Sequence, residues 1–303
     1  MPIDLNEGLE QEPIIDNPIE EVNELETETE VSAQGLSVEE QSDPNKITVT
    51  VADQQTPIIV LFGPPSCGKT MTLIRMTRYL SKQGYQVVPI RTFRPASDSH
   101  YKAMCDGFDE MINSNDAATS TNRISFMLVE VIRNGRPLCQ ILEAPGEYYF
   151  DPANPNRQFP VYVNKIIACN NRKIWTIFVE PDWSDPAPRQ NYVTKINRLK
   201  SKMRTSDKTI FIYNKIDLTP LVISPGHVYM NEALKSVNNL YPNIFTPFKN
   251  QNPITKIFKK YNCDFVPFQT GEFNESTDGT TYVEGPDEYP KMLWNKWLKL
   301  IQG

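Results

Sequence analysis

The amino-acid sequence predicts an α/β fold built on a mostly parallel sheet with one antiparallel hairpin strand. Strand-like and helix-like segments alternate along the chain, which is typical of βαβ units. The run PIIVLF at 57–62 is apolar throughout and bounded by proline and glycine, as expected of a strand buried on both faces. Asn134-Gly135 separates two further apolar runs, which indicates a β-hairpin. Only the hairpin is therefore expected to bring an antiparallel strand into the sheet.

The individual elements follow from apolar alternation for strands and from amphipathic spacing with stop signals for helices. Strands are expected at KITVTV (46–51), PIIVLF (57–62), YQVVPI (85–90), ISFMLVEVI (124–132), PLCQIL (137–142), KIWTIFVE (173–180), KTIFIY (208–213) and CDFVPFQ (263–269). Helices are expected at 69–84, 100–113, 159–170, 188–203, 231–241, 253–262 and 287–302.

Acidic charge is concentrated at the start of the chain. The 303 residues have a net charge of −6, but residues 1–46 carry 14 acidic residues and one lysine, which leaves +7 on the rest. Residues 1–45 also contain no aromatic or basic residue, a composition typical of disorder. We expect a disordered acidic tail at 1–45 and a folded domain at 46–303. The tail is a solubilising segment, an arm that binds a protein partner, or a segment that folds back on the basic body.

Several function classes are disfavoured by composition. No apolar run approaches the roughly 20 residues of a membrane span, and the N-terminus lacks the pattern of a signal peptide. The five cysteines are dispersed, which disfavours a disulfide framework or a zinc site. Lysine-rich stretches such as KIFKKY are short, so nucleic-acid binding is not expected. A cytoplasmic location is expected.

Residues 63–70 read GPPSCGKT, which fits the phosphate-loop pattern G-x-x-x-x-G-K-[ST] in full. A strand-like run precedes the motif and a helix-like segment follows it, as this type of site requires. Glycines let backbone N–H groups surround a β-phosphate, the lysine adds positive charge, and the hydroxyl can bind Mg²⁺. The predicted phosphate-binding residues are Gly63, Pro64, Pro65, Ser66, Cys67, Gly68, Lys69 and Thr70, the last also a magnesium ligand.

A second motif, Asn214-Lys215-Ile216-Asp217, directly follows the run KTIFIY. The Asp217 carboxylate can accept both the N1–H and the 2-amino hydrogen of guanine, a donor pair that adenine lacks. The Lys215 stem can lie along the base, and Asn214 can tie this loop to the phosphate loop. The motif therefore predicts a guanine-reading site.

With both motifs in this order, residues 47–303 resemble the Ras-like small GTPases of the translation-factor-related (TRAFAC) class of P-loop GTPases. The resemblance implies a three-layer fold with a six-stranded sheet and the nucleotide at the C-terminal ends of the strands. It also implies GTP or GDP and Mg²⁺ as ligands, and GTP hydrolysis in which Lys69 takes part.

The resemblance assigns the two switches as well. The threonine that holds Mg²⁺ and the γ-phosphate falls on Thr121, with Thr119 as the alternative. The family's Asp-x-x-Gly falls within QILEAPGEYY (140–149), where Gly146 would give its N–H to the γ-phosphate.

Two acidic residues depart from the family pattern. Glu143 replaces the aspartate and is one methylene longer, although its carboxylate can still serve the water shell of Mg²⁺. Glu147 stands where the family has a water-positioning glutamine. Its negative charge near an anionic γ-phosphate predicts slow hydrolysis unless a partner supplies a cation.

Alternatives remain for the acid and for the cation. An ATPase-like interpretation would use Glu180, at the end of KIWTIFVE, as the magnesium acid, but the order of hairpin and glycine favours Glu143. Cations within the chain that could assist hydrolysis are Arg91, Arg94 and Arg123.

The last family motif, a loop over the guanine, is matched weakly by Thr270 in FVPFQTGEF. Extra length lies near 85–120 and 271–288, the second segment expected to form a hairpin, and both would contact protein partners by the family's logic. The favoured function is a slow GTPase that switches between GTP and GDP forms. A nucleotide-holding scaffold without hydrolysis and a P-loop ATPase are the alternatives.

Overall fold

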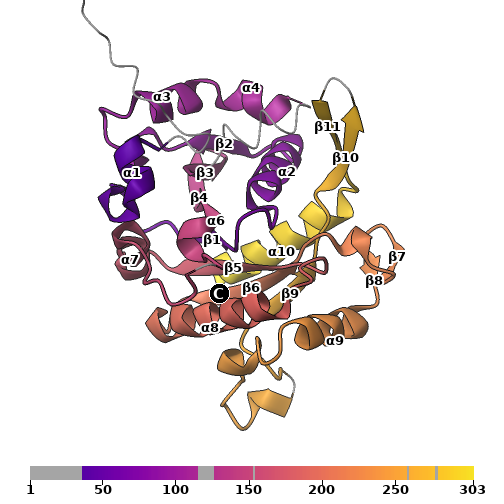
Figure 1. The fold of residues 1–303 in the computed structure, drawn as a ribbon. Coiled ribbons are helices and arrows are strands. Elements are labelled where there is room, and N and C mark those ends of the chain that lie inside the picture. Colours follow the sequence, from indigo (N-terminus) through magenta and orange to yellow (C-terminus); the bar gives the residue numbers. More distant parts are fainter. Residues whose placement is uncertain (1–35, 115–125, 153, 258, 277–278) are drawn as a thin grey trace, which may run out of the picture.

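The computed structural model of the chain describes residues 36–114, 126–152, 154–257, 259–276 and 279–303. Its centre is a seven-stranded sheet, shown in Figure 1. In spatial order the strands are β2 (Gln86–Pro89), β3 (Met127–Arg133), β4 (Arg136–Glu143), β1 (Ile58–Phe62), β5 (Lys173–Val179), β6 (Lys208–Tyr213) and β9 (Asp264–Pro267).

The direction of the strands confirms the predicted mixed sheet. Strand β3 is antiparallel to both of its neighbours, β2 and β4, and every other pairing in the sheet is parallel. The family resemblance implies six strands, whereas the sheet has seven. The additional strand is β2, whose alternating segment pairs with the outer side of β3.

Helices cover both faces of the sheet. Figure 1 shows α2 (Lys69–Lys82) and α10 (Glu288–Gln302) on one side, with α8 (Pro186–Lys202) and α9 (Met230–Leu240) on the other. The expected α/β layering is therefore present. The shorter elements are α1 (Val38–Ser42), η1 (Pro44–Lys46), η2 (Arg91–Phe93), α3 (Ser99–Asp106), α4 (Phe108–Asn113), α6 (Gly146–Tyr149), α7 (Val161–Ala168), η3 (Ile216–Leu218), β7 (Val222–Ser224), β8 (His227–Val228), η4 (Thr246–Phe248) and η5 (Thr255–Ile257).

The two predicted hairpins are both present. Asn134 and Gly135 have φ angles of 51° and 72°, which is the left-handed pair that a tight type I′ turn between β3 and β4 requires. Strands β10 (Gly271–Ser276) and β11 (Gly279–Glu284) pair antiparallel in a separate two-stranded sheet. The second hairpin lies beside α2 and α10 rather than extending the central sheet (Figure 1).

Strand β1 lies at the centre of the sheet, between β4 and β5, and all five of its residues are buried. Phe62 is paired with Ile177 of β5, and Val179 of β5 with Tyr213 of β6. The C-terminal ends of these three parallel strands therefore reach the same edge of the sheet. This register places the phosphate loop and the loops after β5 and β6 side by side.

Two predicted elements were wrong, and a third is helical as predicted but interrupted. Segment 46–51 is not a strand. Ile47 and Val49 are buried as the alternation predicts, but the segment does not pair with any strand that the structure describes, and the Thr50 N–H instead donates to the carbonyl of Phe93. The predicted α-helix at 253–262 is absent from its described residues, which contain the short 3-10 helix η5. The flanks of the segment are joined by backbone hydrogen bonds between Asn250 and Lys260 and between Phe248 and Asn262. Helix 100–113 is divided at Gly107 into α3 and α4.

Ordered structure begins before residue 46, within the segment expected to be an acidic tail. Leu36 is fully buried, and α1 begins with a capping box in which Ser37 and Glu40 exchange hydrogen bonds. The guanidinium of Arg94, only 4% exposed, pairs with the Glu40 carboxylate at 2.7 Å. A buried arginine requires a partner charge, so these residues belong to the domain. The remaining tail, 1–35, lies outside the described residues.

Replacing Glu40 by glutamine is expected to destabilise the domain by about 1.5–3 kcal/mol, because a hydrogen-bonded charge opposite buried Arg94 is lost. Glutamine keeps the capping box, so the helix start is unaffected. The control is Glu39→Gln, whose exposed pair with Lys46 should contribute no more than about 1 kcal/mol. Urea unfolding measures both, and equal losses would contradict the assignment.

Candidate functional site

The phosphate loop connects β1 to α2 in a conformation that requires small residues. Gly68 has a φ of +90°, and a Cβ there would lie 2.3 Å from Asn214 Nδ2. A Cβ on Gly63 would lie 2.5 Å from the sulfur of Cys67. The loop is therefore closed tightly against its neighbours. Gly68 is required by its backbone conformation as well as by space, whereas Gly63 is favoured by space alone.

The side chain of Lys69 lies inside the loop. Its side chain is 5% exposed, and Nζ donates to the carbonyl of Pro64 at 3.0 Å. The neighbouring Cys67 is also buried, and burial raises the pKa of its thiol to about 11. Cys67 is thus a neutral packing residue at physiological pH.

The Asn214–Asp217 loop is joined to the phosphate loop by one hydrogen bond. Asn214 Nδ2 donates to the carbonyl of Cys67 at 2.9 Å. Asn214 Oδ1 is buried and has no hydrogen-bond partner among the residues that the structure describes. An unpaired buried acceptor is costly, so this oxygen is a candidate for contact with a bound molecule.

Lys215 is oriented by acidic residues at the end of β5. It adopts a φ of 54°, and its Nζ lies 2.6 Å from Glu180 Oε2 and 3.0 Å from Asp182 Oδ2. Desolvation lowers the pKa of Lys215, but the bonds to these carboxylates outweigh it and raise the pKa overall. The acid considered for an ATPase-like site, Glu180, is therefore bound to the lysine of the guanine motif.

Glu143 lies next to the hydroxyl of the phosphate loop. The Thr70 hydroxyl donates to Glu143 Oε1 at 3.0 Å, and the backbone N–H of Phe126 donates to Oε2 at 2.7 Å. The carboxylate is 2% exposed, and desolvation raises its pKa while the charge of Lys69 opposes that shift. Two hard oxygen donors at this separation suit Mg²⁺, which takes its other ligands from phosphate and water.

Gly146 touches the phosphate loop. A Cβ at this position would lie 2.4 Å from both Pro64 C and Pro65 N. The glycine predicted for the second switch is thus packed against the opening residues of the phosphate loop, at the start of α6. Glu147 follows it in the first turn of α6 and is partly exposed.

A cavity of about 330 Å³ lies where these loops meet, at the lower end of the size range for small-molecule sites. Most of its lining was anticipated, namely Ser66, Gly68, Lys69, Thr70, Asn214, Lys215 and Thr270. Met71 and Phe273 complete it. The sequence offered no motif for these two, and only the position of 271–276 directly after Thr270 could have suggested Phe273.

Other predicted residues lie apart from this cavity or outside the described chain. Asp217 is exposed and does not line the cavity, although it lies in the short helix η3, which begins directly after Lys215. Arg91 pairs with Asp106, and Arg94 is held by Glu40 and Asp98. Residues outside the described ranges are Thr119, Thr121 and Arg123.

In the described parts of the chain, no helix has the length and apolar character needed to span a membrane. The same residues contain no group of three or more His, Cys, Asp and Glu side chains arranged to hold a metal ion.

No protein-family model and no curated protein matches the chain. Among solved structures it is similar to a Plasmodium falciparum protein described as nucleolar GTP-binding protein 1, with 13% identity and a TM-score of 0.40 over 84% of this chain and 92% of that one. It is also similar to the GTPase-like domain of S. cerevisiae Ski7 bound to GDP and inorganic phosphate, with 12% identity and a TM-score of 0.42 over 82% of this chain and 50% of that one.

A third similar structure is Roco2 RocCORdC of Methanosarcina barkeri bound to GDP, with 10% identity and a TM-score of 0.33 over 84% of this chain and 51% of that one. The chain therefore spans about half the length of the Ski7 and Roco2 chains. With TM-scores below 0.5, none of these similarities bears on what the chain binds.

Replacing Gly146 by alanine is expected to destabilise the protein by about 1–3 kcal/mol, because the new methyl group would overlap the backbone of Pro64 and Pro65. The control is Gly107→Ala, where the nearest atom would be 3.5 Å away and φ is negative. That substitution should be neutral or slightly stabilising. Urea unfolding compares the two, and an equal, small effect would disprove the close contact.

Proposed function

We propose that the chain binds a guanine nucleotide together with Mg²⁺, hydrolyses GTP slowly, and acts as a GTP/GDP switch for protein partners. The observation that carries the proposal is the hydrogen bond from Asn214 to Cys67, which brings a guanine motif and a complete phosphate loop to one cavity. The resemblance to Ras-like GTPases in motif order supports the same assignment.

The phosphate end would be held by the loop after β1. Backbone N–H groups at the start of α2 and the Lys69 ammonium would receive the β- and γ-phosphates. Mg²⁺ would be held by Thr70 and, through water, by Glu143, with Thr121 as a further ligand by resemblance. The metal would neutralise charge on the phosphates. Gly146 would add an N–H donor next to Pro64.

The base end would be read by the loop after β6. Asp217 would accept two hydrogen bonds from guanine, and the Lys215 stem would lie along the ring. The ion pairs of Lys215 with Glu180 and Asp182 support this role, because they restrict where its side chain can lie. This use of Glu180 argues against the ATPase alternative, which requires that acid at the magnesium ion.

Hydrolysis is expected to be slow because the chain places negative charge where the reaction needs a neutral or positive group. Glu147 follows Gly146 directly, and the arginines considered for assistance, Arg91 and Arg94, are already paired with carboxylates. A protein partner that supplies a cation would offset this negative charge and increase the rate of hydrolysis. The same observations keep a non-hydrolysing scaffold as the second candidate function. The switch segments, the insertions at 85–120 and 271–288 and the acidic tail are proposed as the partner-binding regions.

A nucleotide titration tests the assignment of the base. GDP and GTP are expected to raise the melting temperature, and ATP is not. Asp217→Ala should weaken GDP binding by about ten- to 150-fold, since a hydrogen bond to a charged group contributes roughly 1.5–3 kcal/mol. Asp217→Asn offers one acceptor and one donor, which fits xanthine better than guanine.

The control for this titration is Glu232→Ala on α9, which removes only an exposed pair with Lys235. Equal stabilisation by ATP and GDP would remove the guanine assignment.

Single-turnover hydrolysis separates the switch from the scaffold. The wild type is expected to hydrolyse GTP slowly, and Glu147→Gln should increase the rate because it removes a negative charge beside the γ-phosphate. Lys69→Ala is the inactive reference. A wild-type rate equal to that of Lys69→Ala would favour the scaffold, and a slower Glu147→Gln would assign the carboxylate a productive role.

A further inference from the structure

The β10–β11 hairpin places an aromatic ring at the cavity between the phosphate loop and the guanine motif. Phe273 of β10 lines this cavity together with Lys215, Thr270 and Met71. Its side chain is 46% exposed, whereas its cross-strand partner Tyr282 is 2% exposed. A large ring left partly exposed at a cavity has apolar surface available for a flat ligand.

We propose that Phe273 is a base-contacting residue whose ring packs on the nucleobase of the bound nucleotide. The inference rests on the proposed nucleotide-binding function and deepens it, because neither the phosphate loop nor the Asn214–Asp217 motif includes this hairpin. Aromatic rings stack on any base, so Phe273 contributes affinity for the nucleoside while Asp217 selects guanine.

The position of the ring is fixed within the hairpin. Tyr282 donates its hydroxyl hydrogen to the carbonyl of Thr270 at 2.8 Å, and the Phe273 and Tyr282 rings lie 5.4 Å apart, tilted by 37°. At the base of the hairpin the two strands approach so closely that a Cβ on Gly271 would lie 2.1 Å from the carbonyl oxygen of Val283. The ring therefore lies on a strand that is paired along its length, not on a free loop.

The same strand runs next to the guanine motif. Phe273 of β10 lines the same cavity as Asn214 and Lys215 of the loop after β6, so strand β10 lies against the loop that would bind the Watson–Crick edge of guanine. A ring from this strand is well placed for the face of the same base.

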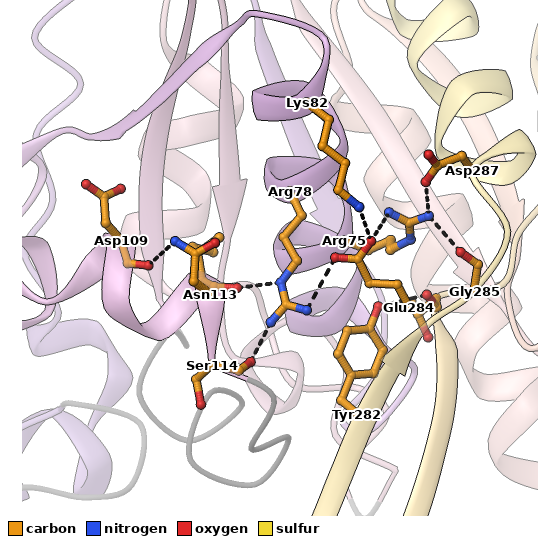
Figure 2. A network of polar contacts seen from close by, with 12 residues as sticks. Arg75, Arg78, Lys82, Asp109, Asn113, Ser114, Tyr282, Glu284, Gly285 and Asp287 are labelled. Carbon is orange, nitrogen blue, oxygen red and sulfur yellow. Dashed lines mark hydrogen bonds and ion pairs between the residues drawn. The ribbon is translucent and has the colours of Figure 1, made fainter.

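The hairpin is anchored to the helix that follows the phosphate loop, as Figure 2 shows. Glu284, at the end of β11, lies 3.0 Å from Arg75, 3.4 Å from Arg78 and 2.6 Å from Lys82, all on α2. Arg75 also donates to the carbonyl of Gly285 at 2.8 Å, and the Arg78 guanidinium lies 5.3 Å from the centre of the Tyr282 ring.

These contacts hold Glu284 ionised. Burial alone would raise the pKa of Glu284, but the surrounding cations lower it. Because α2 begins at Lys69, one helix supports both the phosphate-binding residues and the ring proposed for the base. The distance between the two is therefore set by a rigid element, as a preformed binding site requires.

The test measures nucleotide affinity of the full chain by calorimetry. Phe273→Ala should weaken GDP binding by about five- to 150-fold, the loss that follows removal of one stacked aromatic ring. Phe273→Tyr should retain wild-type affinity. Binding of inorganic triphosphate, which has no base, should be unchanged in both variants.

The matched control is Val283→Ala, an exposed residue on the neighbouring strand that does not line the cavity. If the wild type binds GDP but Phe273→Ala and Val283→Ala bind it equally well, the inference is overturned. If Phe273→Ala weakens inorganic triphosphate to the same extent, the ring acts by supporting the loops and not by contacting the base, which also overturns it. Failure of the wild type to bind any guanine nucleotide would instead remove the proposed function.

Discussion

The candidate site depends on one contact between two loops that are far apart in sequence. Asn214 Nδ2 reaches the carbonyl of Cys67 only because Gly68, which follows Cys67, has no side chain in its path. The parallel register of β1, β5 and β6 brings the loops to the same edge of the sheet, and this bond fixes their final separation. The cavity between the two loops depends on that separation, since Gly68 and Lys69 line it from one side and Asn214 and Lys215 from the other.

Much of the central fold was predictable because buried parallel strands are apolar without interruption, as in β1, and because Asn134-Gly135 fits only one kind of tight turn. The same local signals failed where tertiary contacts decided the conformation. Segment 253–262 has helical spacing, but Ile254 and Ile257 are 72% and 76% exposed and find no core to cover. The KITVTV segment alternates like a strand but has no ladder partner beyond one bond to Phe93.

The motif residues of the candidate site were predictable for a different reason, since glycine, lysine and hydroxyl positions in a phosphate loop are fixed by chemistry. Phe273 was not predictable in this way, because an aromatic residue in an inserted segment has no required spacing to the motifs. The position of the Phe273 ring depends on the ion pairs of Glu284 with three cations on one face of α2. These pairs are long-range, so the local sequence does not predict them. Glu40 and Arg94 are a second pair of this kind, and their contact ties residues before 46 to the folded part of the chain.

Helix α2 emerges as the element that both insertions depend on. Arg78 donates to the carbonyls of Ile112 and Ser114 at the end of α4, while its guanidinium also lies beside Glu284 of the hairpin (Figure 2). A buried guanidinium satisfied by two insertions at once resists displacement of either, because each departure would leave unpaired hydrogen-bonding groups in a desolvated setting. Arg78 therefore joins both inserted segments to the helix that follows the phosphate loop, and Arg75 and Lys82 strengthen the link to the hairpin.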